Sequence, residues 1–218
     1  MKFKIINLLV IFLIAAGFSG CAKKTIEKTN ETGMTPNNLQ KKAILIIAHE
    51  GFQNIEYETT RKVLEQAGIN ITIASSKTGE AESKTGLITE TVKVDKTINE
   101  IRVEDFDVVV FIGGPGAKLE FVENSTAHQL AQETVSKEKI LAAICIAPEI
   151  LAKAGVLNGK KATVWSDPTV DLTPIQFLKD NGAEYMTEDV VVDGKIVTAN
   201  GPLAAEKFGQ KIVELLGL

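Results

Sequence analysis

A chain of 218 residues, 44% of them hydrophobic and 24% charged, has the composition of a single globular domain and not that of a disordered or fibrous protein. The net charge of −4 is mixed in sign along the chain, without the basic stripe that would indicate nucleic-acid binding. Two cysteines in unlike surroundings do not make a disulfide framework, and two distant histidines without a CxxC motif give no metal-ligand spacing, so we expect no metal.

The N-terminal segment has the pattern of a secretory signal. Lys2 and Lys4 precede an apolar run over residues 5–16, and small residues follow it. This run is shorter than the roughly 20 residues of a transmembrane helix, which favours a signal peptide over an uncleaved anchor helix. Residues 18–21, Phe-Ser-Gly-Cys, resemble the bacterial lipobox, although Phe18 stands where leucine is usual.

We therefore expect residues 1–20 to be a signal peptide and Cys21 to be lipidated as the new N-terminus. Two or more acyl chains hold a protein stably on a membrane. Residues 21–40 are polar with little apolar periodicity, and we expect a flexible tether there. On this interpretation the protein is an exported, membrane-anchored lipoprotein that faces the extracytoplasmic side, with one folded domain over residues 41–218.

Residues 41–218 alternate between apolar strands and helices. The first half predicts, in chain order, a strand at 41–51, a helix at 52–67 ended by Gly68, a strand at 69–76, a strand or hairpin with a short helix at 86–101, and a strand running into a glycine-rich turn at 106–117. The second half predicts a helix at 125–137 capped by Asn124 or Ser125, a strand at 139–144, a helix at 147–159, a strand at 161–165, a helix at 173–181, a hairpin at 189–199 and a helix at 203–216.

This alternation indicates an α/β fold with a mostly parallel sheet covered on both faces, because strands rich in valine, isoleucine and leucine have no polar face to expose. Binding and catalytic sites in such sheets lie at the carboxyl ends of the strands. Three loops meet that description, at residues 49–52, 113–117 and 145–148. We expect these loops to converge on one edge of the sheet.

Cys145 lies between an apolar strand and a helix that Pro148 opens, which is the arrangement of a nucleophile elbow. The free amides and partial positive charge of a helix N-terminus favour the thiolate, so we expect the pKa of Cys145 to be lowered and to depend on Glu56. A buried structural cysteine is the alternative, and position alone favours neither.

Two further features become informative beside Cys145. The Gly-Gly-Pro-Gly-Ala stretch at 113–117 predicts either an anion cradle of backbone amides or a tight strand-to-helix turn, and no Walker lysine follows it. Glu56, on the first turns of a helix, is either a site carboxyl group or a solvated surface residue. Convergence of the three loops favours the site interpretation for both.

The chain resembles the ThiJ/PfpI superfamily, which includes the Parkinsonism-associated deglycase and archaeal PfpI-type proteases. The resemblance covers residues 42–217 and depends on four stretches that occur in order: EGFQNIEYETTRKVLEQAG, FDVVVFIGGPGA, LAAICIAPEILAKAGVLNGKKATVW and VVVDGKIVTANGP. It implies a flavodoxin-like three-layer sandwich related to class I glutamine amidotransferases. It also implies that Cys145 is the nucleophile, that Glu56 faces it, and that the backbone N–H groups of Gly114 and Ile146 are oxyanion donors.

The match departs from the family at both of its alternative histidine positions. Protease-like members carry histidine directly after the nucleophile, where this chain has Ile146, and deglycase-like members carry it at the position of Trp165. We expect Trp165 and His49 to line the site. His49 is a candidate for the missing imidazole, and Asp167 is a candidate acid near the cleft. His128 is expected to face solvent.

The resemblance and these departures favour a cofactor-independent Cys–Glu protein with weak glyoxalase or deglycase chemistry on a small reactive carbonyl, or a role in stress protection. A non-enzymatic redox sensor or chaperone-like protein is the first alternative. A cysteine peptidase or amidase is the second, which the missing histidine disfavours most. Family members are often dimers or larger assemblies, so we expect a homodimer or larger homo-oligomer.

The lipobox resemblance predicts that Cys21 is acylated while Cys145 stays a free thiol. Mass spectrometry of detergent-extracted protein is expected to show a mature chain that begins at a lipid-modified Cys21. A mature form that begins at another residue and carries no lipid would contradict this prediction.

Overall fold

The computed structural model describes residues 40–83, 89–167 and 169–218. Within these ranges a seven-stranded sheet has the order β11-β12-β8-β7-β1-β3-β6, in which every neighbouring pair is parallel except β11 and β12. Its strands are β1 (Lys42–Ile46), β3 (Asn70–Ser75), β6 (Lys96–Thr97), β7 (Val108–Phe111), β8 (Ile140–Ile144), β11 (Val190–Asp193) and β12 (Ile196–Ala199).

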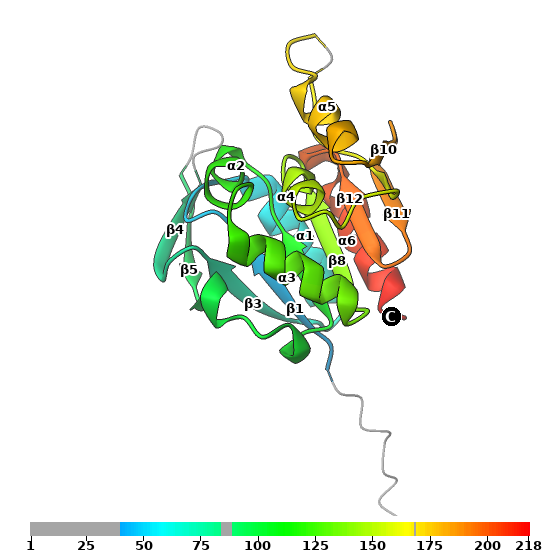
Figure 1. The fold of residues 1–218 in the computed structure, drawn as a ribbon. Helices are drawn as coiled ribbons and strands as arrows, with labels where there is room; N and C mark the ends of the chain where they lie inside the picture. The colour runs from blue at the N-terminus through cyan, green and yellow to red at the C-terminus, as the bar shows by residue number, and fades with distance from the viewer. Residues whose placement is uncertain (1–39, 84–88, 168) are drawn as a thin grey trace, which may run out of the picture. The chain divides into compact units, whose positions relative to one another are not determined.

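Helices cover both faces of this sheet, as Figure 1 shows. On one face α1 and α6 pack against each other and against the strands; on the other, α3 and α4 lie over β7 and β8. The α-helices are α1 (Asn54–Gln66), α2 (Pro115–Phe121), α3 (Ser125–Ser136), α4 (Pro148–Lys153), α5 (Thr173–Asp180) and α6 (Ala205–Leu215), and the 3₁₀ turns are η1 (Ile98–Glu100), η2 (Val103–Asp105) and η3 (Pro202–Ala204).

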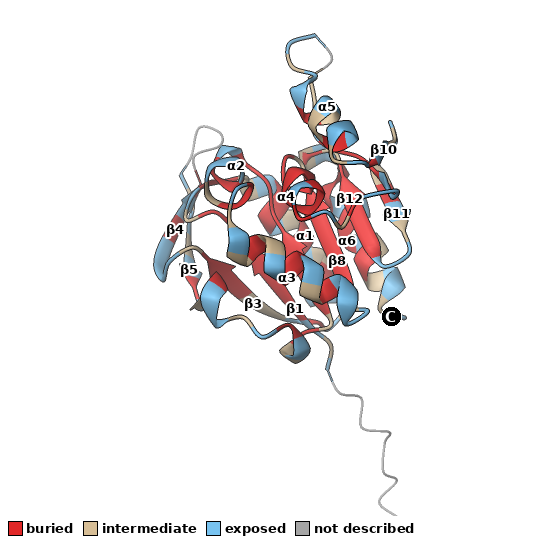
Figure 2. Ribbon diagram, viewed as in Figure 1, coloured by how far each residue is buried: buried red, intermediate tan, exposed pale blue. Residues whose placement is uncertain are grey.

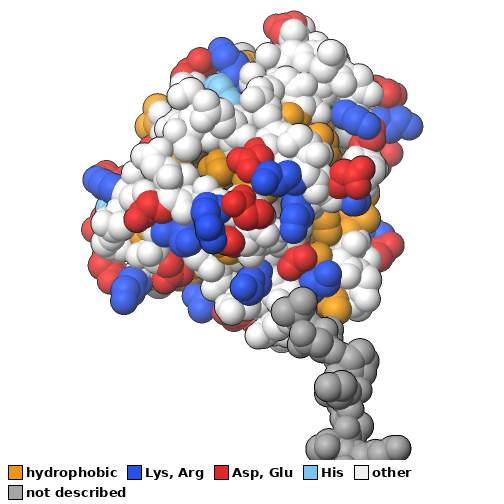
Figure 3. Space-filling model, turned by 60° about the horizontal axis from the view of Figure 1, so that its bottom comes forward, with side chains coloured by type: hydrophobic (Ala, Val, Ile, Leu, Met, Phe, Trp, Pro, Cys, Tyr) orange, Lys and Arg blue, Asp and Glu red, His pale blue; other side chains and the backbone are white. Residues whose placement is uncertain are grey.

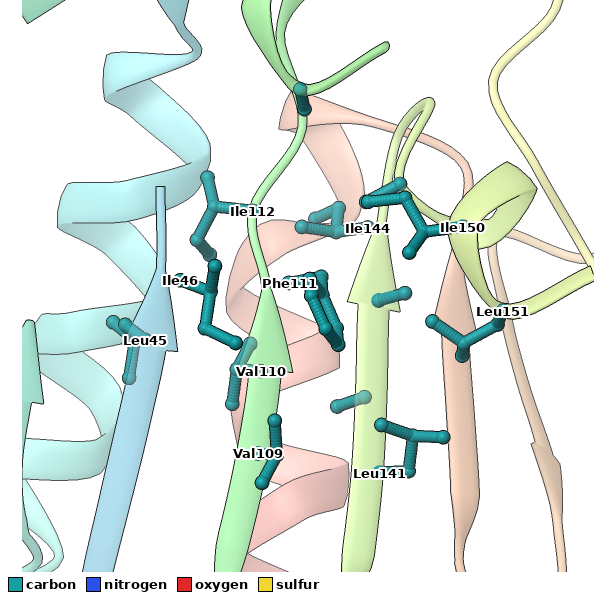
Figure 4. Packing of buried hydrophobic residues seen from close by; sticks show 14 of the residues in the cluster. Leu45, Ile46, Val109, Val110, Phe111, Ile112, Leu141, Ile144, Ile150 and Leu151 are labelled. Carbon is teal, nitrogen blue, oxygen red and sulfur yellow. The ribbon is translucent and has the colours of Figure 1, made fainter. Parts of the chain in front are cut away.

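The core follows directly from the composition of the central strands. All residues of β7 and β8 are buried, as are four of the five in β1, because each strand has a helix layer on both sides (Figure 2). Figure 4 shows Ile150 and Leu151 of α4 beside the upper part of β8. This packing fixes the helix that follows Cys145 against the end of its strand.

The predicted α/β fold with a mostly parallel sheet is confirmed. Asn124 caps α3 through its side chain, which accepts from the backbone N–H groups of Thr126 and Ala127. The predicted hairpin at 189–199 is formed by β11 and β12, with Gly194 in the left-handed conformation at the turn.

Other elements differ from the prediction. The strand expected at 161–165 is only β9 (Lys161–Ala162), which pairs with β10 (Glu184–Tyr185) outside the central sheet. The helix expected at 147–159 ends at Lys153, and turns follow it. Helix α2 and a small sheet of β2 (Glu50–Phe52), β4 (Gly79–Ser83) and β5 (Thr91–Val94) were partly or wholly unexpected.

The expected signal peptide, Cys21 and most of the tether lie outside the described residues. None of the helices in the described ranges combines the length and hydrophobicity that crossing a bilayer requires.

On the face shown in Figure 3, lysine and arginine side chains are interspersed with aspartate and glutamate.

Candidate active site

Cys145 occupies a strained turn directly after β8. Its φ of 64° lies in the left-handed region, which costs a residue with a side chain on the order of 1 kcal/mol. Two backbone hydrogen bonds hold the turn: the Cys145 N–H donates to the Ala199 carbonyl at 2.8 Å, and the Trp165 N–H donates to the Cys145 carbonyl at 2.8 Å. The turn therefore presents the thiol at the carboxyl edge of the sheet, where the elbow pattern places it.

Glu56 is fully buried beneath this thiol. It lies in the first turn of α1, and its Oε2 accepts a hydrogen bond from the Gly113 N–H at 3.1 Å. The carboxyl group is also hydrogen-bonded to Cys145. Glu56 is therefore not the solvated helix residue of the alternative interpretation.

Gly113 permits this contact because it has no side chain. A Cβ at Gly113 would stand 2.5 Å from the Cys145 Cβ and 2.7 Å from Glu56 Oε2. Both distances are below those that real Cβ atoms tolerate, so any larger residue would push the two groups apart. The Gln53 N–H donates to the Gly113 carbonyl at 3.0 Å and ties the start of α1 to the same loop.

The two backbone amides expected as oxyanion donors are directed at the sulfur. The N–H groups of Gly114 and Ile146 both donate to Cys145 Sγ. Gly114 reaches this position with a φ of 107°, and a Cβ there would meet the Gly51 carbonyl oxygen at 2.4 Å. The glycine-rich stretch therefore supplies a sulfur-facing amide as well as a tight turn.

Burial controls the protonation of the Glu56–Cys145 pair. Desolvation raises the pKa of Glu56 to about 8, although its hydrogen bonds with Cys145 and Gly113 lower it in part. Burial also raises the pKa of Cys145, and the neighbouring Glu56 carboxylate raises it further; the two amides offset only part of this. The expectation of a lowered thiol pKa is therefore wrong, because desolvation and the adjacent carboxylate outweigh the amides.

A cavity of about 460 Å³ opens over Cys145. The backbone elements that meet there are the starts of α1, α2 and α4, the loop after β9, and η3. The lining residues are Gln53, Gly114, Pro115, Lys118, Leu119, Cys145, Ile146, Trp165, Asp171 and Pro202. Trp165, at the position of one family histidine, is among them.

An ion pair between a half-exposed lysine of the wall and a buried carboxylate behind it was not foreseen. Glu149, in the first turn of α4, has no exposed surface, and both of its carboxylate oxygens lie 3.1 Å from Lys118 Nζ on α2. Burial raises the pKa of Glu149, and Lys118 counteracts the rise. Lys118 directly follows the glycine-rich stretch at 113–117, which is the one sequence signal for its proximity to Cys145.

Three other candidates lie elsewhere or have other roles. His49 is absent from the cavity wall; its Nε2 stands 3.9 Å from where a Cβ on Gly79 would be, beside β4. His128 is half-buried and not solvent-facing, since its Nε2 contacts the Val122 carbonyl at 2.7 Å. Hydrogen bonds from Thr169 lower the pKa of Asp167, which makes it a poor acid.

The site therefore combines a thiol, one buried carboxyl group and two convergent amides. A pKa near 8 makes Glu56 a stronger base than an exposed glutamate and brings its proton exchange close to neutral pH. When sulfur attacks an electrophile, Glu56 is placed to accept the thiol proton and to return it later. The amides stabilise negative charge on sulfur or on an oxygen bonded beside it.

The raised thiol pKa predicts slow alkylation of Cys145 at neutral pH. The rate of iodoacetamide labelling is expected to rise with pH, with an inflection above the ordinary value of about 8.5 for a free thiol. Glu56→Gln removes the negative neighbour and should move the inflection to lower pH. Intact-mass measurement of labelling from pH 6 to 10 checks both proteins. An inflection below 8 in the unaltered protein, or no shift in Glu56→Gln, would contradict the account.

Comparison of the sequence with known proteins identifies relatives that span most of it. The chain is 34% identical to an uncharacterised protein of Methanocaldococcus jannaschii over 86% of this chain and 88% of that one. It is 33% identical to the dj-1beta protein of Drosophila melanogaster, over 80% of this chain and 89% of that one. It is 31% identical to a deglycase of Pyrococcus horikoshii, over 80% of this chain and 99% of that one.

Solved structures agree with this relationship. A ThiJ/PfpI domain protein from Brachyspira murdochii matches with a TM-score of 0.74 and 29% identity over 82% of this chain and 98% of that one. Drosophila melanogaster DJ-1beta matches with a TM-score of 0.70 and 32% identity, over 83% of this chain and 92% of that one. The DJ-1/PfpI family model matches residues 41–215. The chain therefore belongs to the DJ-1/PfpI family.

Proposed function

We propose that this protein is a cofactor-independent enzyme that detoxifies small 2-oxoaldehydes such as methylglyoxal, with Cys145 as nucleophile and Glu56 as the proton carrier. The observation that carries the proposal is the buried hydrogen bond between these two side chains beneath an open cavity. Relatives with deglycase names, and a Caenorhabditis elegans relative named as a glutathione-independent glyoxalase, support chemistry of this type.

The reaction proceeds through covalent attachment to sulfur. Cys145 Sγ adds to the aldehyde carbon, the thiol proton passes to Glu56, and Glu56 returns it to the carbonyl oxygen to give a hemithioacetal. Glu56 then takes the C–H proton to give an enediol and delivers it to the neighbouring carbonyl carbon. The hydroxyl proton of the hemithioacetal passes to the neighbouring oxygen, which leaves a thioester beside a new alcohol. Water hydrolyses the thioester and frees the thiol. The aldehyde carbon is oxidised, its neighbour is reduced, and water is the only other reactant.

Peptide hydrolysis is a poorer fit to the same groups. An amide must expel an amine, and the amine needs a proton donor beside the leaving group. None of the described residues that line the cavity is a histidine. One Bacillus subtilis relative carries a cysteine-protease name, so the peptidase alternative is tested together with the aldehyde reaction.

The redox-sensor alternative uses the same sulfur. The Gly114 and Ile146 amides that contact Sγ would also stabilise the oxygens of an oxidised cysteine. Turnover of methylglyoxal distinguishes an enzyme from a protein that only becomes oxidised.

We further propose that the enzyme acts outside the cytoplasm, as a lipoprotein anchored through Cys21 and assembled as a homodimer or larger oligomer. The lipobox-like residues 18–21 support the anchor. The oligomer proposal follows from the family resemblance.

The proposed chemistry predicts conversion of methylglyoxal to lactate without added cofactor, and negligible cleavage of casein or fluorogenic peptides. Cys145→Ser is expected to abolish conversion. Glu56→Gln should lose about 10²–10⁴-fold in rate, the usual contribution of general acid–base catalysis. The rate should rise with pH toward about 8 as Glu56 loses its proton and becomes able to accept the thiol's. Cys145-dependent peptide cleavage without lactate formation would overturn the proposal.

A further inference from the structure

The cavity over Cys145 is far larger than methylglyoxal. Its volume of about 460 Å³ lies in the range of roughly 300–1,000 Å³ typical of pockets for drug-sized ligands. A three-carbon oxoaldehyde is comparable with a few water molecules, each of which occupies about 30 Å³ in the liquid. Most of the cavity therefore remains for a group that the reaction itself does not need.

The charged groups of the wall already have partners inside the protein. Lys118 pairs with the buried Glu149, and the Asp171 carboxylate accepts from both the backbone N–H and the hydroxyl of Thr173. A ligand with a charged tail would have to compete with these contacts. The charges therefore do not favour an ionic substrate.

Apart from Gln53, the rest of the wall is apolar and continues onto the surface. Pro115, Leu119, Ile146, Trp165 and Pro202 all line the cavity. The Leu119 side chain is 87% exposed and Leu203, next to Pro202, is fully exposed. Trp165 is 38% exposed beside the nucleophile, and its backbone hydrogen bond to the Cys145 carbonyl fixes its position. Large apolar side chains gathered at the mouth of a reactive site gain stability when an apolar ligand covers them.

We propose that the Cys145 cavity selects electrophilic carbonyl compounds that carry an apolar aryl or alkyl group, with Trp165 and Leu119 contacting that group. The substrate class is thus 2-oxoaldehydes with an apolar substituent, converted by the same balanced steps to the corresponding 2-hydroxy acids. This substrate class rests on the proposed function, whereas selection of the apolar group depends only on the cavity.

Two experiments separate these parts. In the first, the ratio of kcat/KM for phenylglyoxal to that for methylglyoxal is measured in the full chain. Because contacts in an apolar pocket discriminate by roughly 10–200-fold, the ratio should be about tenfold or more. Trp165→Ala and Leu119→Ser should each reduce it. Val192 on β11 is an apolar residue with 39% exposure, close to that of Trp165, and lies outside the cavity wall. Val192→Ala should therefore leave the kcat/KM ratio unchanged.

The second experiment needs no turnover. Cys145 is alkylated with iodoacetamide and with N-benzyl iodoacetamide, and each rate is divided by the rate with glutathione. A preference for the benzyl reagent that is reduced in Leu119→Ser but kept in Val192→Ala supports apolar selection. If the same protein converts no oxoaldehyde, the proposed function fails and apolar selection stands. Equal alkylation rates together with equal kcat/KM values would overturn the inference and leave the proposed function standing.

Discussion

The site depends on the hydrogen bond between a fully buried carboxyl group, Glu56, and the thiol of Cys145. Removing a carboxylate from water is costly, so burial raises the pKa of Glu56 to about 8 and the group stays mostly protonated below that pH. This single shift turns an ordinary glutamate into a group that exchanges protons near neutral pH. In the proposed mechanism, this proton exchange takes the place of the one that histidine usually supplies in that range.

The surrounding fold serves to hold the pair together. Gly113 leaves the space in which the carboxyl group and the thiol meet, and the φ of 64° at Cys145 directs the sulfur toward that space. The packing of α4 on β8 (Figure 4) and the backbone hydrogen bonds of Cys145 with Ala199 and Trp165 offset the conformational energy of this strained turn. Loops from separate strands thus converge because parallel strands end at one edge.

The sequence predicted the central sheet well because its strands are continuous apolar runs. The family motifs predicted that Glu56 faces Cys145, and the structure places the two side chains together. It did not predict β4, because Gly79–Ser83 has neither β-branched residues nor a long apolar run and forms only by pairing with its neighbours. The strand at 161–165 was overestimated because Trp165 bonds to the Cys145 loop instead of a neighbouring strand. The burial of Glu56 and Cys145 and the Lys118–Glu149 contact depend on tertiary packing, which the sequence pattern does not show. Because the helix-terminus argument left out this burial, it gave the wrong direction for the pKa shift of the Cys145 thiol.

The most direct test of this account is the protonation state of Glu56 itself. Isotope-edited infrared spectroscopy, with Glu56→Gln subtracted from the unaltered protein, resolves the C=O stretch of a protonated carboxyl group. We expect this band to be present at pH 6.5 and to disappear with a midpoint near pH 8. A carboxylate signal at pH 6.5, with no protonated band above pH 5, would contradict the claim that burial holds the proton on Glu56.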